Sequence, residues 1–264
     1  MKSEWTMMTW REVRDRGKED SSVVLIPIGC VEAQGAHTPL GMEFLMADAL
    51  AKAVARKTGS IALPAVPFGY SSDFVSIPGT IFARPETLTM LYEDIYRSVL
   101  QAGFSHVFFL AYHIPNQWIV ERVARKIRQE HGILCAWVNP GALAATYVKD
   151  FFADAARARG HGGEPSLSLM RYLVPEAVDL KGAKATPGPS EFRGLKMIGG
   201  APAMVEGVPV GFPVNWEELY PETGGFGDPT MGSEDIGRRI FERLVDDISR
   251  VVDAFRAMNT KTLG

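Results

Sequence analysis

The feature that most constrains the fold is a short apolar run, Val23 to Gly29, which is rich in β-branched residues and ends in glycine. Continuous apolarity without polar alternation is typical of a strand that is buried on both faces. Similar runs follow at 61–66, 106–111 and 133–138. Strands of this kind must be covered by helices on both sides, so the runs predict an α/β protein with a mainly parallel sheet.

Longer stretches with helical apolar periodicity lie between and after these runs. They are expected as helices at 43–57, 86–102, 117–130, 142–158 and 233–258. The last is amphipathic, with one apolar stripe that would pack on the main body. Residues 181–221 are rich in glycine and proline and are expected to form loops with a hairpin. Because no compositional break indicates a linker, the chain is expected to be a single domain, 1–264.

Composition narrows the classes of function. The net charge is -3 and no basic block is present, so binding to nucleic acid or to an anionic membrane has little electrostatic support. The two cysteines, Cys30 and Cys135, fit neither a disulfide framework nor a cysteine-rich zinc site, which favours a reducing compartment. Neither a membrane-spanning apolar run nor a signal peptide is recognisable. We therefore expect a cytoplasmic protein.

A functional site is expected in the loops that follow the strands, because parallel sheets carry their sites at the carboxyl ends of the strands. The loop 29–43 holds Glu32, His37 and Glu43, and the loop 112–116 holds His113. Carboxylates and imidazoles held rigidly are suitable ligands for divalent metals. The alternative is that Glu43 only stabilises the N-terminus of its helix and that Glu32 is solvated.

The remaining histidines divide into two groups. His161 lies in a glycine-rich loop, where functional residues concentrate. His106 opens an expected strand and His131 ends an expected helix, so structural roles are predicted for both.

The segment Glu32-Ala33-Gln34-Gly35-Ala36-His37-Thr38-Pro39-Leu40-Gly41-Met42-Glu43 resembles the signature of the creatininase (creatinine amidohydrolase) family, Glu-x-His-Gly-x-His-Leu-Pro-Leu-x-x-Asp. Further segments resemble the family in the same order. They are Ile77-Pro78-Gly79-Thr80 with Pro85-Glu86-Thr87-Leu88, Ala111-Tyr112-His113-Ile114-Pro115-Asn116, Gly160-His161-Gly162-Gly163-Glu164 and Gly224-Gly225-Phe226-Gly227-Asp228-Pro229.

The resemblance implies a three-layer α/β/α creatininase-like fold and a metal-dependent amidohydrolase. Its substrate would be a small amide, often cyclic, with a carbon–nitrogen bond that is not a peptide bond. A metal would polarise the carbonyl group, and His161 would pass a proton, with Glu164 as a second catalytic candidate. His37 would support the site from outside the ligand set. The resemblance also implies a homo-oligomer, commonly a hexamer.

The departures from the signature bear on the metal content. By the resemblance one metal would be held by Glu32, by Glu43 in the place of the usual aspartate, and by His113. The ligands of a second metal are replaced by Gln34, Pro115 and Ser166. We therefore expect one divalent ion per chain, and zinc, manganese and iron all accept these donors. Two alternatives remain open: an enzyme of another class, such as a lyase, isomerase or carbon–carbon hydrolase, and a metal-free binding protein.

Overall fold

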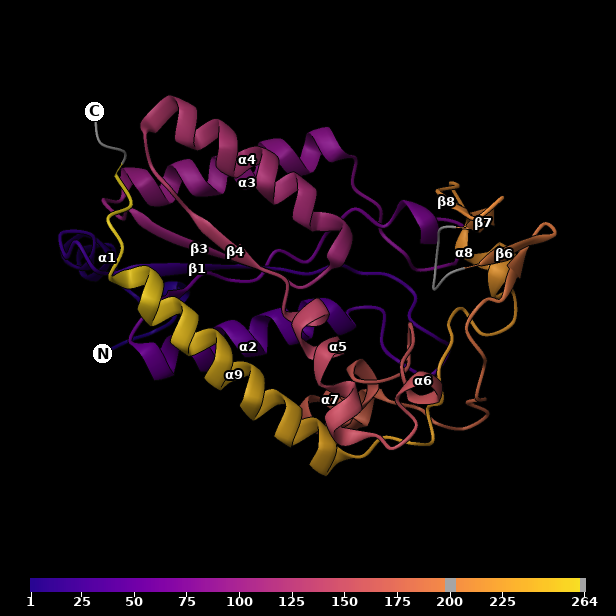
Figure 1. Ribbon diagram of the computed structural model, residues 1–264. Coiled ribbons are helices and arrows are strands. Elements are labelled where there is room, and N and C mark those ends of the chain that lie inside the picture. Colours follow the sequence, from indigo (N-terminus) through magenta and orange to yellow (C-terminus); the bar gives the residue numbers. More distant parts are fainter. Residues whose placement is uncertain (198–202, 262–264) are drawn as a thin grey trace.

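The computed structural model describes residues 1–197 and 203–261. Its main sheet is wholly parallel, with the strand order β2-β1-β3-β4 (Figure 1). The strands are β1 (Val23–Ile28), β2 (Ile61–Ala62), β3 (His106–Ala111) and β4 (Ala136–Val138). The predicted α/β class and the parallel sheet are confirmed.

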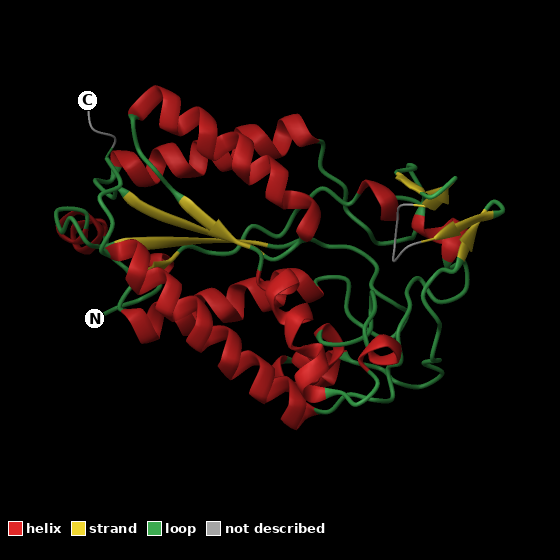
Figure 2. Ribbon diagram, viewed as in Figure 1, coloured by secondary structure: helices red, strands yellow, loops and turns green. Residues whose placement is uncertain are grey.

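Helices cover both faces of this sheet, so that it forms the middle of three layers (Figure 2). On one face lie α3 (Pro85–Gln101) and α4 (Gln117–His131). On the other face lie α2 (Met42–Thr58), α5 (Pro140–Phe151), α7 (Ser166–Leu173) and α9 (Glu234–Arg256). Alternate side chains of β1 enter the two cores. Val23 and Leu25 pack in the core under α2 and α9, and Val24 and Ile26 pack in the core under α3 and α4. Both faces of β1 are fully buried, as its unbroken apolarity predicts.

Two strands are shorter than the sequence indicates. Strand β2 ends at Ala62, shortly before Pro64, which has no N–H group to donate to a neighbouring strand. Strand β4 begins only at Ala136, because Ile133 forms an antiparallel bridge with Lys261 and Leu134 donates its N–H to Thr260. The chain just before β4 is therefore held by the C-terminal segment.

Two regions differ more clearly from expectation. The helix expected over 142–158 ends at Phe151, and a short helix α6 (Ala155–Ala158) starts anew where Asp154 caps it by accepting from the N–H of Arg157. Within 181–221 a four-stranded antiparallel sheet replaces the expected loops and hairpin. Its strands are β5 (Glu191–Phe192), β6 (Leu195–Met197), β7 (Ala203–Val205) and β8 (Val208–Val210). Residues 198–202 of that region lie outside the described part.

The small antiparallel sheet and helix α8 (Trp216–Leu219) lie on the side toward which the parallel strands point (Figure 1). This side is the carboxyl edge of the main sheet, where a site is expected in such folds. Helix α1 (Trp10–Arg16) lies at the opposite end. Among the described helices none is both long and apolar enough to cross a membrane.

Candidate metal centre

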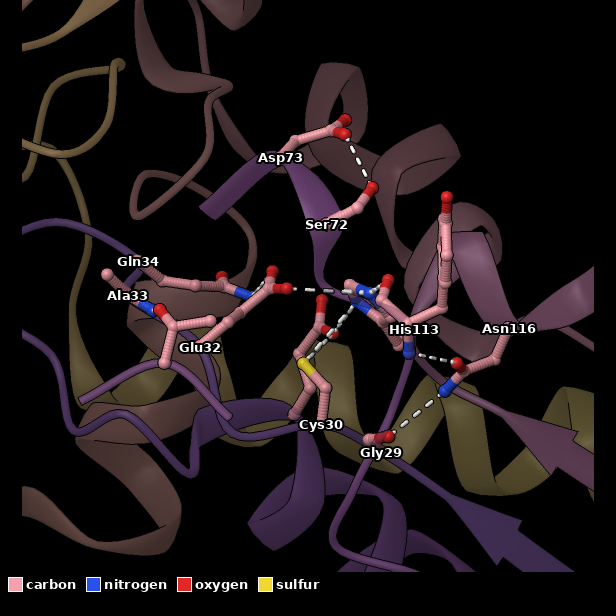
Figure 3. A network of polar contacts seen from close by, with 12 residues as sticks. Gly29, Cys30, Glu32, Ala33, Gln34, Ser72, Asp73, His113 and Asn116 are labelled. Atoms are coloured by element: carbon pink, nitrogen blue, oxygen red, sulfur yellow. Dashed lines mark hydrogen bonds and ion pairs between the residues drawn. The ribbon is translucent and has the colours of Figure 1, made fainter. Parts of the chain in front are cut away.

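Four polar side chains from three segments meet at the carboxyl edge of the sheet. Cys30 and Glu32 follow β1, His113 follows β3, and Glu43 lies in the first turn of α2. Strands β1 and β3 are paired up to Ile28 and Ala111, so the residues just beyond these two positions are necessarily close. Figure 3 shows the side chains of Cys30, Glu32 and His113 directed toward one another.

The distances within this cluster are short. The Nδ1 atom of His113 lies 2.6 Å from Oε2 of Glu43 and 3.4 Å from Sγ of Cys30. The Cys30 thiol lies 3.0 Å from the same Glu43 oxygen. On the other side of the imidazole, Nε2 of His113 lies 3.4 Å from Oε2 of Glu32. One donor atom from each of the four side chains can be chosen so that all lie within 4.8 Å of one another.

The ring of His113 is held by the backbone. Its Nε2–H donates to the carbonyl oxygen of Tyr70 at 2.9 Å. Asn116 fixes that segment by accepting from the N–H of Tyr70 at 2.9 Å and by donating to the carbonyl of Gly29 at 3.0 Å. A metal-binding histidine commonly donates its second ring N–H to a carbonyl, which fixes the tautomer. The arrangement therefore directs Nδ1 toward Glu43 and Cys30.

Burial and mutual charge shift the acidities in opposite directions. Burial raises the pKa of Glu32 to about 7, although the neighbouring His113 opposes the shift. Burial also opposes ionisation of Glu43, but the charge of His113 and its hydrogen bond outweigh it and lower the pKa of Glu43 to about 2. Burial disfavours the charged form of His113, yet Glu32 and Glu43 raise its pKa to about 9. In the absence of a cation, His113 itself carries the compensating positive charge.

The residues of the cluster fit a divalent metal. Glu32 is 1 % exposed, and its Oε2 atom has no hydrogen-bond partner among the described residues. A buried carboxylate oxygen without a donor is costly unless a cation or a further donor reaches it. Carboxylate, imidazole and thiol together are a donor set that zinc and related ions accept.

His161 lies beside the cluster and outside the group of candidate ligands. Its Nε2 atom lies 3.9 Å from Oε1 of Glu32 and donates to the carbonyl of Ala33 at 2.9 Å. The ring stacks on Phe74 at a centroid distance of 4.5 Å and meets the edge of Trp216 at 4.9 Å. Burial lowers the pKa of His161 to about 4, so the imidazole is neutral at pH 7.

The three residues that stand in place of the ligands of a second metal carry no charge. Gln34 donates from Nε2 to Oε1 of Glu32 at 3.3 Å. Pro115 lies in the short turn 114–116 beside His113, and Ser166 is the first residue of α7. His37 is hydrogen-bonded through Nε2 to the carbonyl of Gly162 at 2.7 Å, so it joins the 29–43 loop to the loop that carries His161.

Glu164 is not one of the four clustered candidate ligands. One oxygen accepts from the N–H of Ser168 at 3.2 Å, and the other lies against Gly232, without a hydrogen-bond partner among the described residues. The side chain is fully buried between the start of α7 and the segment before α9. These contacts tie Glu164 to the start of α7, and the catalytic role implied by the resemblance stays a prediction.

The cluster includes Cys30, which was not among the predicted site residues. From the sequence, the two cysteines indicated only a reducing compartment. The signal in the sequence that could have indicated Cys30 is its position. It is the second residue after β1 and lies two residues before Glu32. Phe74 and Trp216, which enclose His161, come from segments that carry no motif.

Comparison with known proteins decides the family. The model of the family described as creatinine amidohydrolase matches residues 6–252. The chain belongs to the creatininase family. It is accordingly a hydrolase that acts on amide bonds, and the expected fold and family are confirmed.

Individual relatives share less than 30% sequence identity with this chain in the comparisons that follow. Creatinine amidohydrolase of Pseudomonas putida is 28% identical over 191 residues, 66% of this chain and 72% of that protein. The mycofactocin precursor peptide peptidase of Mycobacterium ulcerans is 27% identical over 86% of this chain and 84% of that protein. The solved structure of a manganese creatininase superposes with a TM-score of 0.79 at 22% identity, over 98% of this chain and 100% of the other. At that identity the superposition shows the fold alone.

Proposed function

We propose that this creatininase-family enzyme hydrolyses a carbon–nitrogen bond of a small amide, with one divalent metal ion held by Glu32, Glu43 and His113. The observation that carries the proposal is the convergence of these three buried or half-buried side chains at one edge of the sheet, beside His161. When bound, the ion would polarise a carbonyl oxygen and acidify a water molecule.

The surrounding residues supply the proton chemistry. The hydrogen bond from Nε2 of His161 to Ala33 leaves Nδ1 as the nitrogen that accepts a proton. A ring whose pKa is about 4 does not retain that proton, so His161 returns it to the departing nitrogen. Phe74 and Trp216 hold the imidazole plane and exclude water from its face.

The substrate would bind next to His161. A pocket borders this residue and is lined further by His37, Lys184, Thr223 and Phe226. Its walls thus include glycine-rich backbone, the ring of Phe226, the cationic side chain of Lys184 and the carboxylate of Glu222, which suit a compact polar molecule. The relatives include enzymes named for creatinine and for a peptide, so both kinds of amide belong in the assay.

The experiment that tests this function is hydrolysis by the full chain loaded with zinc or with manganese. The substrate panel comprises creatinine, other five-membered cyclic amides, formamides and short peptides. We expect a small non-peptide amide to be cleaved and chelation to abolish the activity. Cleavage of carbon–carbon bonds, elimination or isomerisation with the same loaded protein would favour the alternative class of metal-assisted enzyme. Cleavage of peptides alone would overturn the proposed substrate class.

We also propose that the chain forms a homo-oligomer, a hexamer by its family resemblance. Apolar side chains exposed beside the cluster support a subunit contact there: Ile114 is 60% exposed and Trp118 is 45% exposed, and Trp118 packs edge-on against Tyr70. Light scattering of the purified chain, with Trp118→Glu as the disrupting variant, measures the mass directly. A monomeric unmodified chain would contradict this proposal.

A further inference from the structure

Cys30 is surrounded by polar groups, unlike an ordinary core cysteine. Its side chain is fully buried, and its sulfur lies 3.0 Å from Oε2 of Glu43 and 3.4 Å from Nδ1 of His113. Cys135, by contrast, is packed among the apolar residues of the core under α3 and α4. A structural cysteine behaves as a small apolar side chain, so the polar position of Cys30 calls for another explanation.

The sulfur faces the same side of the imidazole as the Glu43 carboxylate does. Because Nε2 of His113 is engaged by the carbonyl of Tyr70, Nδ1 is the nitrogen left to bind a cation. The three atoms Sγ, Oε2 and Nδ1 therefore form one compact triangle. Glu32 is 1 % exposed and completes the cluster: its Oε2 atom faces Nε2 of His113 at 3.4 Å, accepts no hydrogen bond among the described residues and could accept a cation.

A nucleophilic role for Cys30 is the alternative explanation, and the charges disfavour it. A catalytic thiolate requires a positive environment, such as a helix N-terminus or a nearby cation. Here the neighbouring groups include the carboxylates of Glu43 and Glu32. The positive charge nearest to the sulfur is that of His113, which is already paired with Glu43, so a bound metal ion would be the stronger stabiliser of negative charge at the sulfur.

We infer that Cys30 is a thiolate ligand of the proposed metal ion, together with His113 and Glu43, and that it makes the site selective for zinc over manganese. The inference rests on the proposed single-metal function and adds a ligand to it. On binding, a sulfur–metal bond and a nitrogen–metal bond form, the S–H bond of Cys30 and the Nδ1–H bond of His113 break, and both protons pass to solvent. No change of oxidation state is involved.

The preference for zinc follows from the chemistry of the donor. Thiolates are soft ligands that suit zinc, whereas manganese and magnesium favour oxygen ligands. With four protein donors at the site, water would have to enter as an additional ligand, which catalytic zinc sites sometimes accept. Glu43 stands where the family signature has an aspartate. Its longer side chain is compatible with a ligand set that includes the sulfur of Cys30.

The test is cobalt substitution of the full chain after removal of metals. Cobalt(II) bound to a thiolate shows a near-ultraviolet sulfur-to-metal charge-transfer band, which oxygen and nitrogen ligands alone do not produce. We expect this band in the unmodified protein and in Cys135→Ser, the matched control for loss of a buried cysteine. We expect Cys30→Ser to bind cobalt without the band.

Competition between zinc and manganese measures the selectivity. Loss of an outer hydrogen-bond partner of a metal ligand already costs about 10–100-fold in affinity. Loss of a direct ligand in Cys30→Ser should weaken zinc binding by at least that factor and manganese binding far less. The variant Cys30→Asp retains a ligand with a hard oxygen and should shift the preference toward manganese. Circular dichroism checks that each variant is folded.

The outcomes separate the two proposals. If the unmodified protein binds cobalt but shows no charge-transfer band, Cys30 is not a ligand, and the single-metal site without sulfur stands. If the protein binds neither cobalt nor zinc, the metal-dependent function fails together with this inference. A charge-transfer band that persists in Cys30→Ser would also overturn the inference.

Discussion

The imidazole of His113 and the carboxylate of Glu43 meet at 2.6 Å although they are 70 residues apart in the sequence. They come from different layers of the fold, one from the end of β3 and the other from the first turn of α2. Their ion pair, buried beside Glu32, occupies the place in which a cation would be held. Several measurable consequences depend on this cluster and on the elements that support it.

The first prediction concerns metal stoichiometry. Because Gln34, Pro115 and Ser166 occupy the positions of the second ligand set, the purified chain should bind at most one catalytic-type ion. Elemental analysis after loading measures the ratio. The double variant Gln34→His with Pro115→Glu should raise the ratio toward two ions per chain. Two ions bound at full occupancy by the unmodified chain would show that the second site is intact.

The second prediction separates the two histidines of the site. His161→Ala should reduce kcat by about 10²–10⁴-fold, the usual cost of removing a general acid–base, while metal content stays unchanged. His113→Ala should lose both metal and activity, because His113 is a proposed ligand. His131→Ala is the matched control, since this histidine lies at the end of α4 beside Arg97. Full activity of His161→Ala on the true substrate would exclude the proposed proton transfer.

The third prediction concerns pH and Glu164. Burial raises the pKa of this carboxyl in the folded protein above its unfolded value of ~4.3. Between the two values the folded protein binds more protons than the unfolded chain, so this group makes stability fall as pH rises. The unfolding free energy of Glu164→Gln minus that of the unmodified chain should therefore increase with pH across this interval, because only the unmodified chain loses this contribution. Urea unfolding at several pH values measures it.

Exposed Glu176 offers the matched control, because Glu176→Gln removes a carboxyl from the same part of the chain without removing a buried one. A difference for Glu164→Gln that stays constant from acid to neutral pH would mean that burial does not affect this carboxyl.

The fourth prediction concerns the packing of α7 against α9, which supports the segment that carries His161. A Cβ atom at Gly237 would lie 1.9 Å from the carbonyl oxygen of Ser168. Gly237→Ala should therefore lower the unfolding free energy by about 1–3 kcal/mol, despite the better helix propensity of alanine. Gly211→Ala, where a Cβ atom meets nothing within 4 Å, is the control and should change stability by less than ~0.5 kcal/mol. Equal stabilities would contradict the close packing.

Elements with strong local signals were predicted well. Strands β1 and β3 have the expected bounds, because an uninterrupted apolar run needs no information from elsewhere in the chain. Helix α3 begins at Pro85, and α9 is capped by Ser233, whose hydroxyl accepts from the N–H of Ile236. These starts follow from side-chain chemistry within one turn.

Elements that depend on distant partners were predicted less well. The start of β4 is decided by pairing of the preceding residues with the C-terminal segment near Thr260. The antiparallel sheet of β5 to β8 consists of strands of two or three residues, too short to give a periodic pattern. The aromatic enclosure of His161 by Phe74 and Trp216 depends on contacts between segments that are distant in the sequence. Neither segment alone therefore predicts it.

The sequence by itself determined the parallel α/β architecture and the loops that carry Glu32, Glu43, His113 and His161, because apolar periodicity and ligand chemistry are local properties. Only the tertiary structure decided which of these side chains meet. The pairing of β1 with β3 brings Cys30 to His113, and the start of α7 engages the carboxylate of Glu164. The physical reason is that donor groups act over a few ångströms, and such proximity depends on strand order and helix packing.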